Sequence, residues 1–373
     1  MVDTRETSQR IERLMPLAEA VACIERLVEP VPARRVEASE AFGRTLATPV
    51  MIADTYPEAA IALRDGIAVR AEATLDAGAY APVELAGAAV EVGDPMPAGA
   101  DAVAPLDAVE TRGTSICAVT PLAPGDGVLP AGADAAPGPI HCKVAKPLRA
   151  GDLAALAVLG VRHFEVREPR VRVVSARPKP DAVIAAIVGM LAHSVRAEGA
   201  VAITATDCIG LDGALDPADA DAVILVGGSG AGSRDRSMRD LARLGRLVFH
   251  GVGLTPGETA GFGIIAKRPV LVVPGRLDAA FAVWHILGRR LLWRLAGHKR
   301  VERTESLVLS RKISSTLGLA ELVPVARHGD DVAPLATGYL TAQSLARADG
   351  FILVPADSEG FPAGARVEMR SLR

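Results

Sequence analysis

The spacing of apolar residues along the sequence differs between parts of the chain. Residues 16–28 carry apolar side chains at helical spacing behind a first-turn proline, which predicts an amphipathic helix. Residues 36–110 are strand-like and rich in turn residues, and Pro, Gly and Ala dominate 118–140, which predicts surface loops between strands. A short helix is predicted over 151–160 with Asp152 as its N-cap, before a strand-like run.

From about residue 170 the pattern alternates regularly between short apolar runs and helical segments. This alternation predicts a parallel, doubly wound sheet. From residue 301 onward the chain is again β-rich, which predicts a small separate β-domain. The strands predicted for the alternating region are 171–174, 200–205, 222–226, 247–250 and 269–273. Three helices are predicted there: one from Asp181, its N-cap, to about Arg196, one that ends with residues 241–244, and one over 277–295.

Length and composition narrow the class of protein. A chain of 373 residues is expected to hold two to four domains, and its net charge of −3 argues against a nucleic-acid-binding surface. The charged N-terminus and the absence of a long apolar run predict a cytoplasmic protein with no signal peptide and no membrane contact. Its four cysteines lie singly and its histidines are dispersed, so neither a disulfide framework nor a zinc site is predicted.

The glycine-dense loop 227–235 is the most informative local feature. It follows the apolar run 222–226, and such loops present bare backbone N–H groups to anionic ligands. Pro274 and Gly275 follow another predicted strand, so both turns are expected at the carboxyl edge of the sheet, where α/β proteins bind ligands. The alternative is that the loop is only a flexible turn.

Further segments carry a resemblance along nearly the whole chain. They are AFGRTLATPV (41–50), LRDGIAV (63–69), VGDPMPAGADAV (92–103), GGSGAGSRD (227–235), TPGET (255–259), VVPGRL (272–277) and ARADGFILVPADSEGFPAGARVEM (346–369). In this order they resemble the FGR-LA, S-A-M-D-G-Y-A, T-G-A-P-x-P-x-G-A-D-A-V, G-G-V-S-V-G-x-x-D, K-P-G-K-P, L-P-G-N-P and C-terminal segments of the molybdopterin molybdenumtransferases of the MoeA and gephyrin type.

The resemblance implies a multidomain α/β fold. Its parts are a doubly wound three-layer α/β molybdopterin-binding domain, β-rich N-terminal domains and a small C-terminal β-domain. The implied boundaries are 10–52 with 138–166 for an N-terminal domain whose helix serves dimerisation, 53–137 for an inserted β-rich domain, 167–300 for the α/β domain, and 301–373 for the C-terminal domain.

The resemblance also implies an activity and partners. The activity is insertion of molybdate into adenylylated molybdopterin, with Mg²⁺ and release of AMP. The expected assembly is an elongated homodimer in which Asp65 lies near the partner's third domain. Other cofactor-biosynthesis proteins or a molybdoenzyme client are further expected partners.

Matching the motifs assigns roles to residues of this chain. Asp65 is the implied catalytic residue, and Asp65 and Asp235 are the implied metal ligands. The implied molybdopterin and phosphate contacts are Gly227, Gly228, Ser229, Gly230, Gly232, Ser233, Asp235, Pro256, Gly257, Pro274, Gly275 and Arg276.

Several positions depart from the family pattern. Both lysines of K-P-G-K-P are replaced, by Thr255 and Glu258, and a unit charge about 5 Å from an anionic group is worth roughly 3 kcal/mol. Turning lysine into glutamate is therefore a swing of about 6 kcal/mol if nothing compensates. The acids of T-G-D-E-L are missing from SARPKP (175–180). The other replacements are Ala62, Ile67 and Arg276, for serine, tyrosine and asparagine.

Three hypotheses follow from these departures. The chain is a working transferase in which Arg234 and Arg276 (and, less strongly, Arg236) replace the lost cations, a non-catalytic molybdopterin or cofactor carrier, or a scaffold that acts through protein contacts. The retained glycine loop and Asp65 disfavour the scaffold, and the missing lysines disfavour the transferase.

Overall fold

The protein divides into two compact units. The computed structural model describes residues 9–140, 144–204, 211, 213, 220–298 and 302–372. The larger unit comprises Met1–Thr48, Val144–Ala150 and His163–Arg373, and the smaller unit comprises Pro49–Lys143 and Gly151–Arg162. The four-domain division predicted from the sequence stays a prediction.

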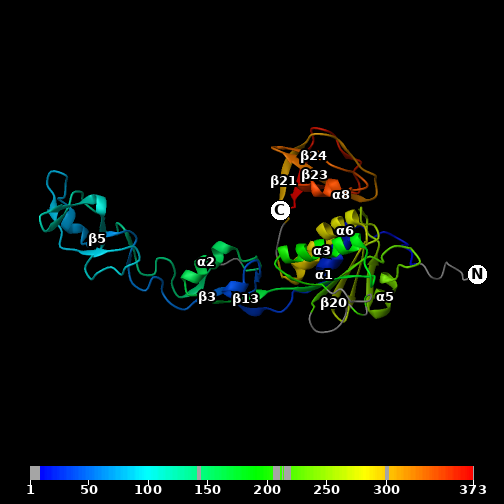
Figure 1. The fold of residues 1–373 in the computed structure, drawn as a ribbon, viewed down its shortest axis with the longest axis horizontal. Helices are drawn as coiled ribbons and strands as arrows, with labels where there is room; N and C mark the ends of the chain where they lie inside the picture. The colour runs from blue at the N-terminus through cyan, green and yellow to red at the C-terminus, as the bar shows by residue number, and fades with distance from the viewer. Residues whose placement is uncertain are drawn as a thin grey trace, which may run out of the picture. The chain divides into compact units, whose positions relative to one another are not determined.

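A six-stranded sheet forms the core of the larger unit (Figure 1). Four neighbouring strands are parallel, and β19 runs antiparallel to both of its neighbours, β20 and β17. The prediction of a parallel sheet is therefore wrong at β19, whereas β17 again has the direction of the other four strands. Ala266 and Lys267 join β19 to β20 in a two-residue turn with positive φ, a hairpin geometry that only antiparallel strands allow. In spatial order the strands are β15 (Val201–Thr204), β14 (Arg170–Ser175), β16 (Ala222–Val226), β20 (Arg268–Val273), β19 (Gly261–Ile265) and β17 (Arg246–His250).

Helices cover both faces of this sheet, which accounts for the fully apolar β16. Alternate residues of β16 lie in different apolar cores, Ile224 with residues of α1, α3 and α6 and Leu225 with residues of α5. The helices are α1 (Leu17–Leu27), α3 (Ala182–Ala197), α5 (Ser237–Leu244), α6 (Leu277–Val283), a π-helical turn (Trp284–Gly288) and α7 (Arg289–Leu295).

Two helix predictions can be compared with these elements directly. The carboxylate of Asp181 accepts a hydrogen bond from the Ile184 backbone N–H at 2.9 Å, which confirms it as the N-cap of α3. The helix predicted over 277–295 is confirmed with these bounds, and its middle turn, Trp284–Gly288, is π-helical. Phe281 and Trp284 of this segment are buried, and none of the helices in the described ranges is long and apolar enough for a bilayer crossing.

A second sheet is built by the C-terminal part of the chain, as the β-rich pattern predicted (Figure 1). Its core is a separate apolar cluster that includes Leu309, Val325 and Val354. The elements are β18 (Leu254–Thr255), β21 (Thr304–Leu309), β22 (Ile313–Ser314), β23 (Ala320–His328), β24 (Asp331–Pro334), α8 (Ala342–Ala346), β25 (Gly350–Val354), β26 (Gly360–Phe361) and β27 (Arg366–Ser371).

The AFGR segment has a structural role in the larger unit. Arg44 forms an ion pair with the buried Glu168 and donates to the Gly199 carbonyl at 3.2 Å. Burial lowers the pKa of Arg44, and the positive charge of neighbouring Arg34 lowers it further. Arg34 forms an ion pair with the same Glu168. The small sheet fastened in this way consists of β1 (Arg34–Glu37), β13 (His163–Arg167) and β2 (Thr45–Leu46).

Short antiparallel strands and one helix make up the smaller unit. The helix α2 (Ala150–Val158) starts before Asp152, so the prediction of Asp152 as N-cap is wrong and this acid lies in the first turn. The strands are β3 (Val50–Ile52), β4 (Ile61–Ala62), β5 (Gly66–Val69), β6 (Val83–Glu84), β7 (Ala88–Val90), β8 (Ala102–Pro105), β9 (Val109–Arg112), β10 (Ser115–Ala118), β11 (Val128–Leu129) and β12 (Gly138–Ile140).

Candidate functional site

The glycine loop leaves β16 in a conformation that requires glycine. Gly227 and Gly228 have φ angles of +92° and +68°, which side chains rarely adopt. Ser237, at the start of α5, donates from its hydroxyl to the Gly227 carbonyl at 2.9 Å and from its N–H to the Gly228 carbonyl at 3.1 Å. A Cβ on Gly228 would lie 2.3 Å from the Ser237 Oγ, so there is no room for a side chain.

Asp235 closes the loop from its far end. Its carboxylate accepts from the Gly232 N–H at 3.2 Å, and its own N–H donates to the Gly232 carbonyl at 2.9 Å. A Cβ on Gly230 would lie 2.8 Å from the same carboxylate. Asp235 therefore shapes the loop, and one of its two oxygens is already engaged.

Gln9 contacts the loop from a position 219 residues away in the sequence. Its side-chain amide donates to the carbonyls of Gly228 and Gly230 at 2.6 and 2.9 Å. Its Oε1 accepts from the N–H groups of Met238 and Arg239 at 3.1 and 3.4 Å. The sequence prediction missed this residue because no local pattern marks a contact over such a separation.

The backbone polarity of the loop suits an anion. The carbonyls of Gly228, Ser229 and Gly230 all accept from protein donors, with His250 Nε2 lying 2.9 Å from the Ser229 oxygen. In the described ranges, no acceptor contacts the N–H groups of these three residues. These donors are available to phosphate or carboxylate oxygens.

Two further loops meet the glycine loop at the same edge of the sheet, which confirms the prediction made for Pro274 and Gly275. The Gly227 N–H donates to the Val273 carbonyl at 2.8 Å, and a Cβ on Gly275 would lie 3.5 Å from the Gly227 Cα. The hydroxyls of Ser229 and Thr259 lie 3.0 Å apart. The structure thus brings together the segments 227–235, 255–259 and 274–276.

The segment 255–259 carries an acid where a cation was lost. The strand β18 ends at Thr255, and a turn covers Glu258 and Thr259. The carboxylate of Glu258 accepts from the Gly257 N–H at 3.1 Å, so a backbone donor of this loop is already bound to an internal anion. A Cβ on Gly257 would lie 2.9 Å from a Val283 methyl group, which explains the glycine by close packing with α6.

Arg276 lies at the N-cap position of α6 and pairs with an acid of its own helix. Its Nε and Nη2 donate to the buried Asp278 carboxylate at 3.1 and 2.5 Å. This hydrogen bond is the main reason that the pKa of Arg276 is raised, and the charge of Glu258 adds to it. The guanidinium also lies 5.6 Å from the ring centroid of Tyr339. Its charge is therefore largely compensated, although the side chain is 61% exposed.

Other cations border the same edge. Arg177 and Lys179 are exposed in the stretch that follows β14, whose Ala176 N–H donates to the Val226 carbonyl at 2.9 Å. Arg234 is exposed and makes no ion pair in the part of the chain that the structure describes. Sequence reasoning weighed this stretch only for its missing acids and overlooked its two cations, which were detectable from their place after a strand.

Asp65 belongs to the smaller unit, whereas the other predicted site residues belong to the larger unit. It is exposed, and one of its oxygens accepts from the Val92 N–H at 2.9 Å. Among the described residues there is no group of three or more His, Cys, Asp or Glu side chains suited to a metal ion. The metal role of Asp65 and Asp235 stays a prediction; Cys142 and Cys208 lie outside the described residues.

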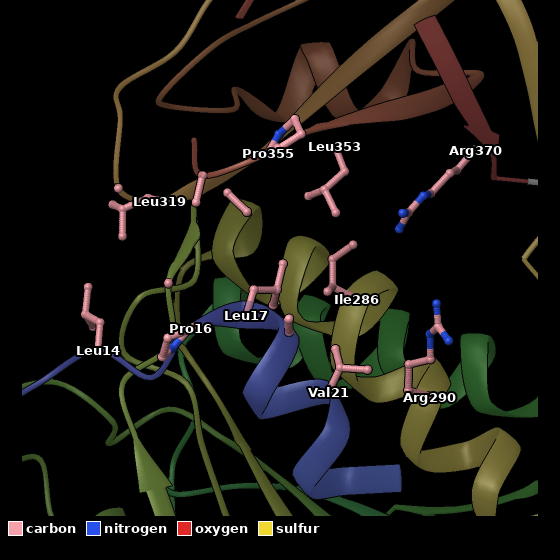
Figure 2. Close-up of a pocket in the computed structure, with 15 residues that line it drawn as sticks. Leu14, Pro16, Leu17, Val21, Ile286, Arg290, Leu319, Leu353, Pro355 and Arg370 are labelled. Atoms are coloured by element: carbon pink, nitrogen blue, oxygen red, sulfur yellow. The ribbon is translucent and has the colours of Figure 1, made fainter. Parts of the chain in front are cut away.

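A cavity of about 810 Å³ lies elsewhere in the larger unit (Figure 2). Figure 2 shows apolar side chains of α1, the π-helical turn and the C-terminal sheet, including Leu17, Ile286 and Leu353, facing it. Arg290 and Arg370 lie at one end, and both pair with Glu302. No residue of the predicted site lines this cavity, so it is separate from the glycine loop.

The chain is similar to known proteins over almost all of its length. Three family models match in order: "MoeA N-terminal region (domain I and II)" over 15–160, "Probable molybdopterin binding domain" over 182–293, and "MoeA C-terminal region (domain IV)" over 306–372. The glycine loop and the segments 255–259 and 274–276 all lie within the second match.

Relatives of similar length match the whole chain. A putative molybdopterin biosynthesis protein of Methanocaldococcus jannaschii is 26% identical, over 97% of this chain and 99% of its own. Molybdopterin molybdenumtransferase 2 of Mycobacterium tuberculosis is 28% identical, over 90% and 94%. A crystal structure of the molybdopterin biosynthesis MoeA protein of Pyrococcus horikoshii superposes with a TM-score of 0.75 at 26% identity, covering 97% of this chain and 100% of that one.

Proposed function

The chain belongs to the MoeA family, and from that membership we propose that it binds molybdopterin or its adenylylated form at the glycine loop, as a protein of molybdenum-cofactor biosynthesis. The observation that carries this proposal is the row of N–H donors from Gly228 to Gly230, none of which meets an acceptor in the described residues. A phosphate of the ligand is the natural acceptor for this row.

The segments around the loop complete the proposed binding surface. Thr259 is joined to the loop through Ser229, and Gly275 lies against Gly227 without a side chain between them. Arg234 offers a cation in the loop itself, and Arg177 and Lys179 offer cations after the neighbouring strand. In this proposal the backbone fixes the phosphate and these side chains supply positive charge.

Within this function, we favour a carrier or insertion chaperone over a transferase. Preorganised donors and charges are usually the largest contribution to catalysis, and losing one can cost about 10²–10³ in rate. Here Glu258 occupies a backbone donor and the charge of Arg276 is held by Asp278. Neither residue is placed to stabilise the negative charge of molybdate or of a departing adenylate.

Turnover distinguishes the carrier from the transferase. The purified protein would be incubated with adenylylated molybdopterin, molybdate and Mg²⁺, and AMP release followed over time. We expect binding without AMP release. Turnover comparable with that of an ordinary family member would overturn the carrier, and absence of any pterin binding would overturn the proposed function and favour a scaffold.

In this proposal, Asp65 and Asp235 do not hold Mg²⁺ by themselves. Asp65 and Asp235 each use one carboxylate oxygen for a backbone N–H, and they lie in different units. Mg²⁺ is therefore proposed to arrive with the phosphate groups of the ligand, since Mg²⁺ is commonly bound by one or two carboxylates plus phosphates. A cytoplasmic location and contacts with other cofactor-biosynthesis proteins or a molybdoenzyme client belong to the same proposal.

A homodimer is proposed from the resemblance. In it, Asp65 would lie near the α/β region of the partner subunit. Light scattering at micromolar concentration tests this assembly, and a stable monomer would remove it.

A further inference from the structure

Gln9 is the one side chain in the described residues that contacts both the glycine loop and the helix that follows it through a single amide group. It is 6% exposed. Its two donors meet the carbonyls of Gly228 and Gly230, and its oxygen meets two N–H groups at the start of α5. A primary amide matches this set of two acceptors and two donors in a way that neither a carboxylate nor a hydrocarbon does.

In the first half of the loop, Gly230 depends on Gln9 more than its neighbours do, because Gly227, Gly228 and Ser229 have other hydrogen-bond partners. The Gly230 carbonyl has Gln9 as its only donor in the described ranges, and the Gly228 carbonyl accepts from both Gln9 and Ser237. Glycines lose more conformational freedom on ordering than other residues. Without the amide, the Gly230 carbonyl loses its donor and the ligand has to order more of this part of the loop, which weakens binding.

Gln9 also occupies backbone N–H groups at the start of α5 that a ligand would otherwise be able to bind. The N-cap residue of α5, Arg236, makes no side-chain capping bond, and the Gln9 oxygen fills that place for Met238 and Arg239. The helix start is thereby satisfied from within the protein. The donors of Gly228, Ser229 and Gly230 are left for an anion, since none of them meets an acceptor in the described residues.

The segment that holds Gln9 is fixed at its other end. The Met15 N–H donates to the Gly251 carbonyl at 3.1 Å, and the Gly253 N–H donates to the Met15 carbonyl at 2.8 Å. Ile11 covers Gly251 so closely that a Cβ there would lie 2.5 Å from an Ile11 methyl group. The segment from Gln9 to Met15 is thus held against the protein by packing and hydrogen bonds, which places Gln9 at the loop.

We infer that Gln9 is a positioning residue for the phosphate-binding loop, acting through the carbonyls of Gly228 and Gly230 so that their N–H groups stay ordered for an anion. This inference rests on the proposed function for its ligand. Its claim about the loop stands on the hydrogen bonds alone.

The test compares Gln9→Met with Gln343→Met, which makes the same change at an exposed glutamine of α8. Molybdopterin affinity is measured below the melting temperature of each variant, and hydrogen exchange is measured over 227–235 without ligand. We expect Gln9→Met to bind roughly tenfold more weakly, as the loss of two hydrogen bonds predicts, and to exchange faster in that segment. Gln343→Met should match the wild type in both.

Three results separate the possible roles. Unchanged affinity in folded Gln9→Met, even with a lower melting temperature, would show a merely structural residue and overturn the inference. Unchanged hydrogen exchange over 227–235 would overturn it as well, whether or not the wild type binds a pterin. Failure of the wild type to bind molybdopterin, with faster exchange in Gln9→Met, would remove the proposed function but keep Gln9 as the residue that orders the loop.

Discussion

The glycine loop and the segments that face it differ in how their polar groups are used. In the loop, carbonyls are held by Gln9, Ser237 and His250, while a row of N–H groups has no acceptor in the described residues. In the facing segments, 255–259 and 274–278 (here called the rim), Glu258 binds a backbone donor and Asp278 binds Arg276. The N–H groups of the loop are therefore available to an anion, whereas in the rim Glu258 and Arg276 are bound to other groups of the protein.

The proposed carrier role rests on this difference, because a site can keep the backbone that binds an anion while it lacks the charged side chains that catalysis needs. A backbone cradle depends on glycine and on chain geometry, so it survives side-chain replacement. Catalysis of anion transfer depends on charged side chains, whose contribution is lost when each meets an internal partner.

The largest expected effect is a break in the loop itself. Gly228→Val places a branched side chain at φ +68° and within 2.3 Å of the Ser237 Oγ, so the loop must move. We expect molybdopterin affinity to fall by roughly a hundredfold or more, equivalent to about 2.7 kcal/mol. Isothermal titration calorimetry measures this loss.

Gly329→Val is the matched control for that change. Gly329 has a φ of +64°, and no neighbouring atom lies within 4 Å of the place that a Cβ would take, so valine there meets the same backbone strain without the clash. Equal losses of affinity in both variants would show that general destabilisation, not the loop, explains the effect.

The second prediction concerns the helix behind the rim. His285 lies between Phe281 and Phe351, with ring centroids 4.4 and 5.4 Å away, and its Nδ1 has no hydrogen-bond partner in the described part of the chain. Burial, helped by Arg289, lowers the pKa of His285 to about 3. Because only the unfolded chain readily binds a proton at this histidine, the free energy of unfolding is highest above pH 6.5, where His285 is neutral in both states. It falls as the pH decreases from 6.5 toward 3.

Between about pH 6.5 and pH 5 this loss should amount to about 2 kcal/mol in the free energy of unfolding. Urea denaturation across this range checks it, with His285→Phe as the variant that lacks the titration and keeps an aromatic ring. Hydrogen exchange should rise over 276–288 before it rises over 227–235. An identical pH slope in the wild type and His285→Phe would contradict the assignment to this histidine.

A smaller effect is expected from restoring a cation to the rim. Glu258→Lys removes the carboxylate from the Gly257 N–H and reverses the charge beside the proposed anion site. Because the position is partly exposed, we expect about tenfold tighter molybdopterin binding, well below the unscreened Coulomb value. The gain should shrink at high salt. Glu359→Lys, at an exposed position before β26, makes the same charge change as a control.

The smallest effect separates the two arginines. Arg234→Ala should weaken binding by about threefold, since Arg234 makes no ion pair in the described ranges, and Arg276→Ala should weaken it less because Asp278 holds that charge. Affinity measurements on both variants check this order. If Arg276→Ala instead lost more than about tenfold and abolished AMP release, Arg276 would be a relocated catalytic cation.

The sequence alone determined the alternation of strands and helices in the α/β region, the Asp181 cap, the β-rich tail and the meeting of two glycine turns at one sheet edge. These features depend on local periodicity, capping chemistry and the direction of parallel strands. The motifs in order also identified the family.

Only the tertiary structure decided what the side chains at that edge contact. Four features came from the fold: the antiparallel strand β19, the π-helical turn after Val283, the pairing of Arg276 with Asp278, and the contact of Gln9 with the loop. Gln9 and Gly228 are 219 residues apart, and whether a charge is free or compensated depends on neighbours in space. The local sequence pattern does not predict such neighbours, because the packing of the whole chain determines them.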